Sequence, residues 1–319
     1  MYRRNIAVVG CGYWGKNLAR NFAELGALAS IVDPDPETAA RHAKQHGVAV
    51  MTLEEALASE QIEALVIAAP AEMHMDLALK GFDAGKHIYV EKPLALSVTD
   101  GERMQDAAKA AGRKLMVGHL LQYHPVFVHL RDMVRAGELG ALRYAYSNRL
   151  SMGKFRVEED AFWSLAPHDV SMLLALFNEE PIEVRGHGLG FITDGIADES
   201  RLDMVFSKGR RAHVFASWLH PFKEQRLVVV GEKSMAVFDD TKPWEEKLAI
   251  YPHEIDMSGH TPAPVKAEPL YPVIATGEPL KSECAHFLDC MADDTTPFTD
   301  AEEALRVLRV LEAPNLPNG

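Results

Sequence analysis

Three glycines near the start of the chain have the spacing of a loop that binds phosphate groups. Gly10, Gly12 and Gly15 form the pattern G-x-G-x-x-G directly after the short apolar run 6–9. The first glycine permits a tight turn, the second lets the backbone approach a pyrophosphate, and the third lets a helix pack closely on a strand. A helix that begins there offers free N–H groups to the phosphates. The pattern therefore predicts a dinucleotide-binding loop.

An aspartate after the second predicted strand indicates which dinucleotide binds. The apolar run 28–32 ends in Asp33. A carboxylate at this place accepts hydrogen bonds from the ribose diol of an adenosine, and its charge repels a 2′-phosphate. The sequence therefore predicts NAD as the cofactor, with Tyr13 and Trp14 of the glycine loop among the residues that contact it.

The composition limits the class of protein. The chain has 319 residues, enough for about two domains. It carries 33 basic and 46 acidic residues, a net charge of −13, which argues against general affinity for nucleic acids or anionic membranes. The sequence has no apolar run of membrane-spanning length and no room for a signal peptide before the first strand. Its three cysteines form neither a disulfide framework nor a metal motif. We therefore expect a cytosolic protein without a bound metal.

The first 120 residues alternate strand and helix signals. The predicted strands are 6–9, 28–32, 48–51, 63–69, 87–90 and 114–117, and the predicted helices among them are 36–46, 53–58, 74–84 and 99–111. This alternation predicts an α/β fold with a parallel Rossmann sheet over residues 1–120. Ligands of such sheets bind at the carboxyl ends of the strands. The residues expected there are Ala69, Pro70, His74, Glu91, Lys92 and His119.

The pattern changes in residues 121–319. After a helix at 126–136, longer alternating segments predict strands at 142–149, 183–192, 201–206, 211–218 and 226–238, the last with a turn at 231–234. These segments predict a C-terminal α+β domain with an open, mostly antiparallel sheet that binds substrate and forms oligomers.

Helices complete the predicted second domain. Val170, Leu173, Leu174 and Phe177 lie on one face of a helix that we expect to begin at His168, after a proline. The segment 241–277 has weak periodicity and is interpreted as a long surface excursion. Two final helices are predicted at 281–291 and 301–311.

The residues at the strand ends resemble a known family. Ala69-Pro70-x-x-x-His74, Glu91-Lys92-Pro93-Leu94, Gly118-His119 and Pro167-His168-Asp169 have the order and spacing found in the Gfo/Idh/MocA oxidoreductases. The resemblance covers essentially the whole chain. It implies a nicotinamide cofactor, hydride transfer to or from a sugar or polyol carbon, and packing into homodimers or homotetramers. It also implies that Lys92 is an active-site lysine and that His168 transfers a proton.

Both side chains suit the oxidation of an alcohol. The hydroxyl proton needs a base whose pKa lies near the working pH, and histidine is the usual choice. If His168 begins a helix, the helix N-terminus helps to keep it neutral. Lys92 can stabilise the charge that develops on the oxygen. We expect His168 to be the base, with Lys92 as the alternative.

One position departs from the family pattern. Several polyol dehydrogenases of the family carry an Asp four residues before the His, where this chain has Ser164. A serine orients the imidazole only weakly, so the pattern looks more like members that oxidise nucleotide-linked sugars. The cations Arg149 and Lys154 suit a diphosphate. The full set of expected substrate contacts is Lys92, Gln122, Tyr123, Arg149, Lys154, Trp163, Ser164 and His168.

The resemblance predicts NAD-dependent oxidation of the C3 hydroxyl of UDP-N-acetylglucosamine to a 3-keto sugar, for amino-sugar synthesis in lipid A or lipopolysaccharide. Two alternatives stay open. The sugar could instead be UDP-N-acetylglucosaminuronate, used for surface polysaccharide. The chain could also be a sensor that binds NAD and a sugar nucleotide without turnover, although the presence of both Lys92 and His168 counts against this.

Overall fold

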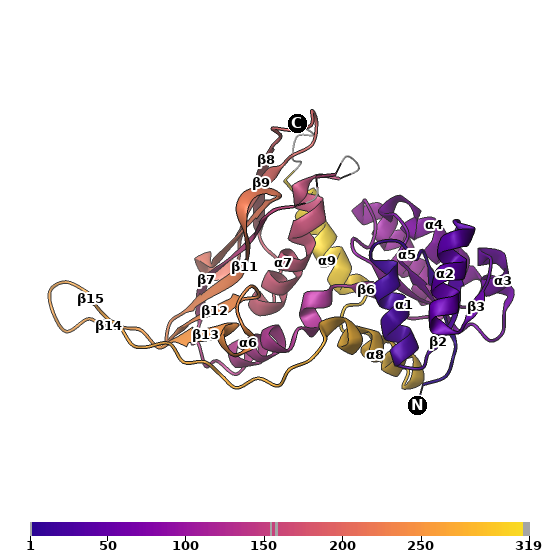
Figure 1. Ribbon diagram of the computed structural model, residues 1–319. Helices are drawn as coiled ribbons and strands as arrows, with labels where there is room; N and C mark the ends of the chain where they lie inside the picture. Colours follow the sequence, from indigo (N-terminus) through magenta and orange to yellow (C-terminus); the bar gives the residue numbers. More distant parts are fainter. Residues whose placement is uncertain (1, 154, 157–158, 315–319) are drawn as a thin grey trace. The chain divides into compact units, whose positions relative to one another are not determined.

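The computed structural model describes residues 2–153, 155–156 and 159–314. The chain divides into two compact units (Figure 1). Unit 1 comprises residues 1–123 and 278–308, and unit 2 comprises residues 124–277 and 309–319. The predicted boundary at 120/121 lies close to the first crossing between the units. The sequence did not predict that the chain returns to unit 1 near its end.

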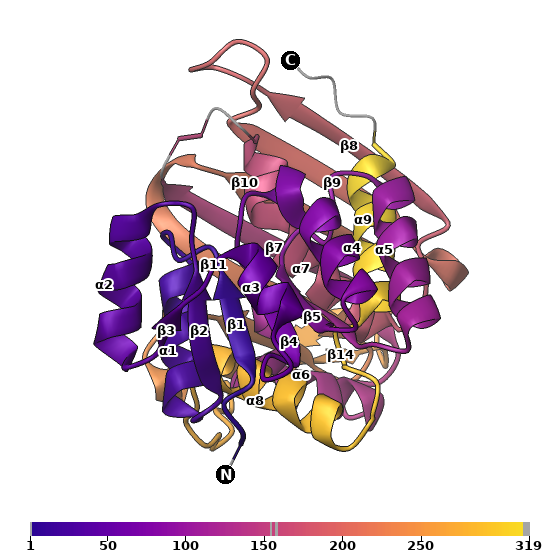
Figure 2. The ribbon, with the colours of Figure 1, turned by 90° about the vertical axis from the view of Figure 1, so that its right-hand side faces the viewer.

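Unit 1 is built on a six-stranded sheet in the order β3-β2-β1-β4-β5-β6, and the strands β1 to β5 are labelled in Figure 2. All neighbouring strands pair in parallel, which confirms the predicted Rossmann architecture. The strands are β1 (Ile6–Val9), β2 (Leu28–Val32), β3 (Ala49–Val50), β4 (Ala64–Ile67), β5 (His87–Glu91) and β6 (Leu115–Gly118).

Seven α-helices of the described residues lie wholly or mainly in unit 1. They are α1 (Gly15–Glu24), α2 (Pro36–His46), α3 (Leu53–Ala58), α4 (His74–Asp83), α5 (Val98–Ala111), α8 (Pro279–Ala292) and α9 (Ala301–Glu312). Local chemistry fixes several of their ends. The Asp35 side chain caps α2 by accepting a hydrogen bond from the Thr38 N–H, and Thr52 and Glu55 form a capping box at α3.

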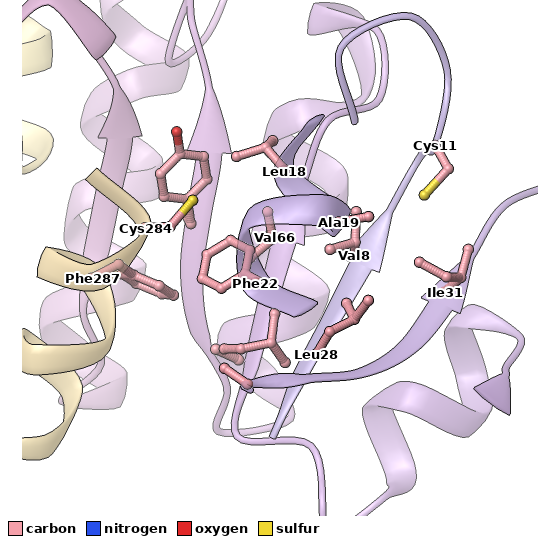
Figure 3. Close-up of a cluster of buried hydrophobic side chains, with 14 of the residues drawn as sticks. Val8, Cys11, Leu18, Ala19, Phe22, Leu28, Ile31, Val66, Cys284 and Phe287 are labelled. Carbon is pink, nitrogen blue, oxygen red and sulfur yellow. The ribbon is translucent and has the colours of Figure 1, made fainter. Parts of the chain in front are cut away.

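Helix α8 belongs to unit 1, which corrects its assignment to the second domain. Cys284 and Phe287 of α8 lie in one buried cluster with Val8 of β1 and Leu18 and Phe22 of α1 (Figure 3). The Arg20 guanidinium adds an ion pair with Glu278 at the start of α8. The reason for the return is apolar burial over a long sequence separation, which no local pattern in the sequence encodes.

Unit 2 contains a seven-stranded sheet in the order β13-β12-β11-β7-β10-β9-β8. Strands β7 and β10 pair in parallel, and the other neighbours pair antiparallel, which confirms the predicted mostly antiparallel sheet. The strands are β7 (Leu142–Met152), β8 (Glu183–Leu189), β9 (Glu199–Val205), β10 (Arg211–Ser217), β11 (Leu219–Gly231), β12 (Met235–Asp239) and β13 (Leu248–Tyr251).

The segment 241–277 is more ordered than predicted. Strand β13 joins the edge of the large sheet by pairing with β12, and β14 (Glu254–Asp256) and β15 (Ala263–Val265) form a separate hairpin (Figure 1). Trp244 donates its indole N–H to the Ile274 carbonyl at 2.8 Å, which ties the end of the segment to its start.

Helices α6 (Pro125–Arg135) and α7 (Ala161–Phe177) lie on one face of this sheet (Figure 1). In β7 the residues that face α7 alternate with those that do not, as in any strand: Ser147 and Arg149 contact α7, whereas Tyr146 stacks on His213 of β10. Among the described residues, no helix has the length and apolar character needed to cross a membrane.

Candidate active site

The three loop glycines each meet the requirement that the sequence pattern implies. Gly10 has φ +88°, a conformation that side chains rarely adopt. A Cβ atom on Gly15 would lie 1.9 Å from the Gly10 carbonyl oxygen, so α1 can approach β1 only with a glycine there. A Cβ on Gly12 would meet nothing within 4 Å. The space beside Gly12, next to the start of α1, fits a pyrophosphate.

A cavity of about 710 Å³ lies beside this loop within unit 1. It is lined by the ends of β1, β2 and β4 and by residues 50–53 around β3, with Asp33, Ala69 and Pro70 among the lining residues. Most of the other lining side chains are apolar, such as Val32, Val50 and Leu77. A pocket of this size and lining, placed at the carboxyl ends of the strands, fits an adenosine.

Asp33 holds the glycine loop as well as facing the cavity. Its Oδ2 accepts a hydrogen bond from the Cys11 N–H at 2.7 Å, and its Oδ1 accepts one from the Asp35 N–H at 2.9 Å. Each oxygen can accept a second hydrogen bond, so these contacts leave capacity for a ribose diol. The contact with Cys11 was not predicted, because a backbone N–H carries no signal in the sequence.

Glu91, at the end of β5, connects the motif Glu91-Lys92-Pro93 to the glycine loop. The Trp14 indole N–H donates to Glu91 Oε1 at 2.6 Å, and the Lys92 N–H donates to Glu91 Oε2 at 3.3 Å. Burial raises the pKa of the Glu91 carboxyl to about 7. The Lys92–Pro93 peptide bond is cis. Tyr13, the other aromatic residue of the loop, is 83% exposed beside Lys16.

His74 has a different role from the predicted one. Its side chain is buried, with Nδ1 2.8 Å from the Pro93 carbonyl oxygen and Nε2 3.0 Å from the Ala69 carbonyl oxygen. Burial lowers its pKa. Because both ring nitrogens face backbone carbonyls, His74 braces the loop after β4 against the turn after Lys92 and does not present a nitrogen to a cofactor.

Three residues after β6 also pack within unit 1. His119 is buried, and its Nδ1 lies 2.5 Å from Glu303 Oε2 on α9. Gln122 is 2% exposed. The Tyr123 hydroxyl lies 3.2 Å from Thr299 Oγ1, and burial raises its pKa. The structure therefore gives His119 and Tyr123 partners within unit 1 and buries Gln122, and the predicted ligand contacts of these three residues stay predictions.

His168 lies inside α7, not at its start, which is a correction. The helix begins at Ala161, and Asp160 caps it by accepting a hydrogen bond from the Trp163 N–H at 2.9 Å. A proline is favoured in a first turn, so Pro167 suggested a helix start, but here it lies within the helix. The expected effect of a helix N-terminus on His168 is therefore removed. Ser164 lies one turn before His168 on the same side of the helix.

Arg149 is already engaged in an ion pair. Its Nε lies 2.5 Å from Asp169 Oδ2 and its Nη2 lies 3.2 Å from Asp169 Oδ1, and Ser147 Oγ donates to the same carboxylate at 2.5 Å. The Asp169 side chain is 1% exposed and that of Arg149 is 12% exposed. Asp169 follows His168 on α7, so this pair anchors the His168 turn to β7. The sequence predicted Arg149 as a diphosphate contact and missed this partner.

Two further predictions concern the same region. Lys154 lies outside the described residues. Trp163 lies in the first turn of α7 and is partly exposed.

Among the described residues, no group of three His, Cys, Asp or Glu side chains has the arrangement of a metal site.

A parallel doubly wound sheet with a glycine loop, an acid after β2 and an adenosine-sized cavity defines a dinucleotide-binding domain. Residues 4–119 match the oxidoreductase family with an NAD-binding Rossmann fold, and residues 127–237 match the Gfo/Idh/MocA C-terminal domain. The chain therefore belongs to the Gfo/Idh/MocA oxidoreductase family.

Several curated and solved relatives are similar over long stretches. UDP-N-acetylglucosamine 3-dehydrogenase from Acidithiobacillus ferrooxidans is 28% identical over 309 residues, 97% of this chain and 95% of the relative. A solved structure of that enzyme superposes with a TM-score of 0.86 at 26% identity, covering 98% of this chain and 96% of the other. Inositol 2-dehydrogenase from Rhizobium meliloti is 27% identical over 236 residues, 70% of this chain and 71% of the relative.

Proposed function

We propose that this protein is an NAD-dependent dehydrogenase that oxidises the C3 hydroxyl of UDP-N-acetylglucosamine to the 3-keto sugar. The observation that carries the proposal is the likeness to UDP-N-acetylglucosamine 3-dehydrogenase, which extends over nearly the full length of both chains. The 3-keto product would be aminated in the synthesis of lipid A or lipopolysaccharide.

The charges around the cavity support NAD over NADP. Asp33 and Glu55 are the charged side chains among the described residues that line it, and no lysine or arginine is among them. A 2′-phosphate placed beside these two acids would be repelled, whereas a ribose diol can donate hydrogen bonds to Asp33. We therefore propose that NAD binds more tightly than NADP.

In the proposed reaction the sugar carbon loses a hydride and its hydroxyl loses a proton. Bound NAD would supply the hydride acceptor. His168 takes the proton, and Lys92 stabilises the charge on the oxygen. Ser164, one turn before His168, replaces the carboxylate that would raise the basicity of the imidazole. Lys92 therefore remains the alternative base.

The substrate contacts are revised by the ion pair of Arg149. Since Nε and Nη2 of this side chain both point to Asp169, we propose that it positions the His168 turn and contributes positive charge only secondarily. Trp163 and Lys154 remain proposed contacts for the nucleotide sugar, while Gln122 and Tyr123 are proposed to shape the site through their packing.

We also propose a cytosolic homodimer or homotetramer that associates through the face of the large sheet opposite α7. Tyr144, Tyr146 and Phe215 share that face, and Tyr144 is 44% exposed. The Arg201 guanidinium lies over the Phe215 ring at 5.0 Å.

The cysteines support the proposed cytosolic location. All three are free thiols and buried, as is common for proteins of reducing compartments.

A panel of UDP-sugars tests the proposed function. Reduction of NAD is followed by nicotinamide absorbance with UDP-N-acetylglucosamine, UDP-N-acetylglucosaminuronate and free N-acetylglucosamine. We expect turnover with the first and little with the others. Preference for the uronate would shift the assignment to the surface-polysaccharide alternative. Binding of NAD and UDP-sugars without any NADH would favour the sensor.

A further inference from the structure

A chain of buried polar groups runs from α8 to the end of β5 in unit 1. The Tyr89 hydroxyl lies 3.0 Å from Glu283 Oε2 and 3.4 Å from Glu91 Oε1. Tyr89 and Glu283 are both 0% exposed. Glu91 is partly exposed, and it receives the Trp14 indole N–H at 2.6 Å. These hydrogen bonds therefore link a fully buried carboxyl group to a partly exposed residue at the end of β5.

The number of hydrogens available in this series of hydrogen bonds decides which group donates to which. One tyrosine hydroxyl has one hydrogen and cannot donate to two carboxylates at once. Burial raises the pKa of Glu283 well above its usual value, which favours the protonated form of this carboxyl. Glu283 can then donate to the Tyr89 oxygen, and Tyr89 donates its own hydrogen to Glu91. Among the described residues, Glu283 Oε1 has no hydrogen-bond partner, as is expected for an oxygen of an uncharged carboxyl group.

The packing around Glu91 fixes the position of its carboxyl group. A Cβ atom on Gly118 of β6 would lie 2.9 Å from both Glu91 Oε2 and the Tyr89 hydroxyl. The neighbouring strand therefore leaves room for this pair only because it carries a glycine. Trp14 holds the opposite oxygen from the glycine loop.

The other titratable groups near this chain come from four elements. Lys92 follows Glu91 directly and lowers its pKa, which partly offsets the effect of burial. Cys284 on α8 and Tyr123 after β6 lie near Glu283, and burial raises the pKa of both groups. Glu303 on α9 contacts His119, and its charge raises the pKa of Glu283. Lys92 is thus the cation whose charge lowers the pKa of Glu91.

The strand order places Glu91 on the nicotinamide side of a bound dinucleotide. The adenosine-sized cavity lies at the ends of β1, β2 and β3, and the phosphate loop follows β1. A dinucleotide crosses such a sheet at the point where the strand order reverses. Its second half therefore lies toward β4 and β5, where Glu91 ends β5. The oxidised nicotinamide ring is a cation, and the reduced ring is neutral.

We propose that Glu91 is a titrating counter-charge for the oxidised nicotinamide ring, held in place by Tyr89 and Glu283 as positioning residues. NAD⁺ binding then converts the Glu91 carboxylic acid to a carboxylate and releases one proton to solvent, whereas NADH binding does not. The inference rests on the proposed function, because it requires a nicotinamide dinucleotide as the ligand.

The size of the effect follows from the titration of Glu91. With a pKa of about 7, about a tenth of the protein carries the carboxylate at about pH 6 and about nine tenths at about pH 8. If NAD⁺ selects the carboxylate, its affinity rises about 10-fold over this interval. The affinity for NADH should change much less.

Calorimetric titration of the intact protein with NAD⁺ and with NADH tests the proposal without substrate. Repeating each titration in buffers of different ionisation enthalpy measures the protons released. We expect release of a substantial fraction of one proton with NAD⁺ near pH 6.5, almost none with NADH, and the affinity change given above. Glu91→Gln should abolish both effects while still binding NADH. Glu54→Gln, an exposed acid on α3, is the matched control and should behave as the unmodified protein.

Two variants test the positioning residues. Tyr89→Phe removes the hydrogen bond to Glu91 and should move the midpoint of the NAD⁺ affinity profile to higher pH. Glu283→Gln replaces a neutral acid by a neutral amide and should leave that midpoint nearly unchanged. If Glu283 were charged, its replacement would move the midpoint downward.

The proposal is overturned if NAD⁺ and NADH release protons equally or if Glu91→Gln retains the release. A protein that binds neither dinucleotide would instead defeat the proposed function itself.

Discussion

Replacing Arg149 by methionine distinguishes a structural cation from a diphosphate ligand. The substitution keeps an unbranched apolar stem up to about the place of Nε but removes both hydrogen bonds to Asp169. The Asp169 carboxylate is 1% exposed, so water cannot replace the lost partner. Ser147 Oγ would remain as its hydrogen-bond donor.

We expect Arg149→Met to lower the free energy of unfolding by a large amount. Removing one partner of a buried ion pair costs about 3–5 kcal/mol, since it leaves an uncompensated charge. For a domain of about 150–250 residues, each kcal/mol lowers Tm by about 2–4 °C, so we expect Arg149→Met to lower Tm by about 6–20 °C. Ser147→Ala removes one hydrogen bond to a charged group and should cost about 1.5–3 kcal/mol.

Differential scanning calorimetry measures these shifts, and a double variant supplies the control. Arg149→Met combined with Asp169→Leu removes the orphaned charge and should recover much of the lost stability. Because Asp169 adjoins His168, the single variant should also lower kcat. An unchanged Tm together with a strongly raised KM for the UDP-sugar would refute the structural role and restore Arg149 as a diphosphate contact.

Three other predictions concern the cofactor and the chemistry. Asp33→Ser should lower NAD affinity and narrow the difference between the Kd values for NAD and NADP; an unchanged ratio would contradict the role of this acid. His168→Asn and Lys92→Ala should each lower kcat about 10²–10⁴-fold while retaining NAD affinity; near-normal kcat in either removes that residue from the proton transfer. Glu91, whose pKa is raised from 4.5 to about 7, stabilises the fold most below pH 4.5 and loses this contribution as the pH rises through 7. Denaturant unfolding of Glu91→Gln should therefore lack this part of the pH dependence.

The sequence predicted what depends on local patterns. The glycine loop, the parallel strands of unit 1 and the acid after β2 were predictable because each depends on particular residues at fixed spacing. Pro167 misled the prediction of α7, since a proline in a helix interior is far rarer than one in a first turn. The cap at Asp160 was the available signal for the true start.

Long-range pairing could not be predicted. The return of α8 to unit 1 depends on Cys284 and Phe287 meeting α1 across more than half the chain. The pairing of Arg149 with Asp169, and of Tyr89 with Glu283, likewise joins residues far apart in sequence. Charged and polar residues look alike in a sequence whether they face a ligand or each other.

Transfer of deuterium from the sugar to the cofactor tests the central claim most directly. The protein is incubated with NAD and UDP-N-acetylglucosamine that carries deuterium at C3, and the reduced cofactor is analysed by mass spectrometry. We predict NADH that contains one deuterium and a sugar product oxidised at C3. Unlabelled NADH, or a label that stays on the sugar, would contradict C3 oxidation of this substrate.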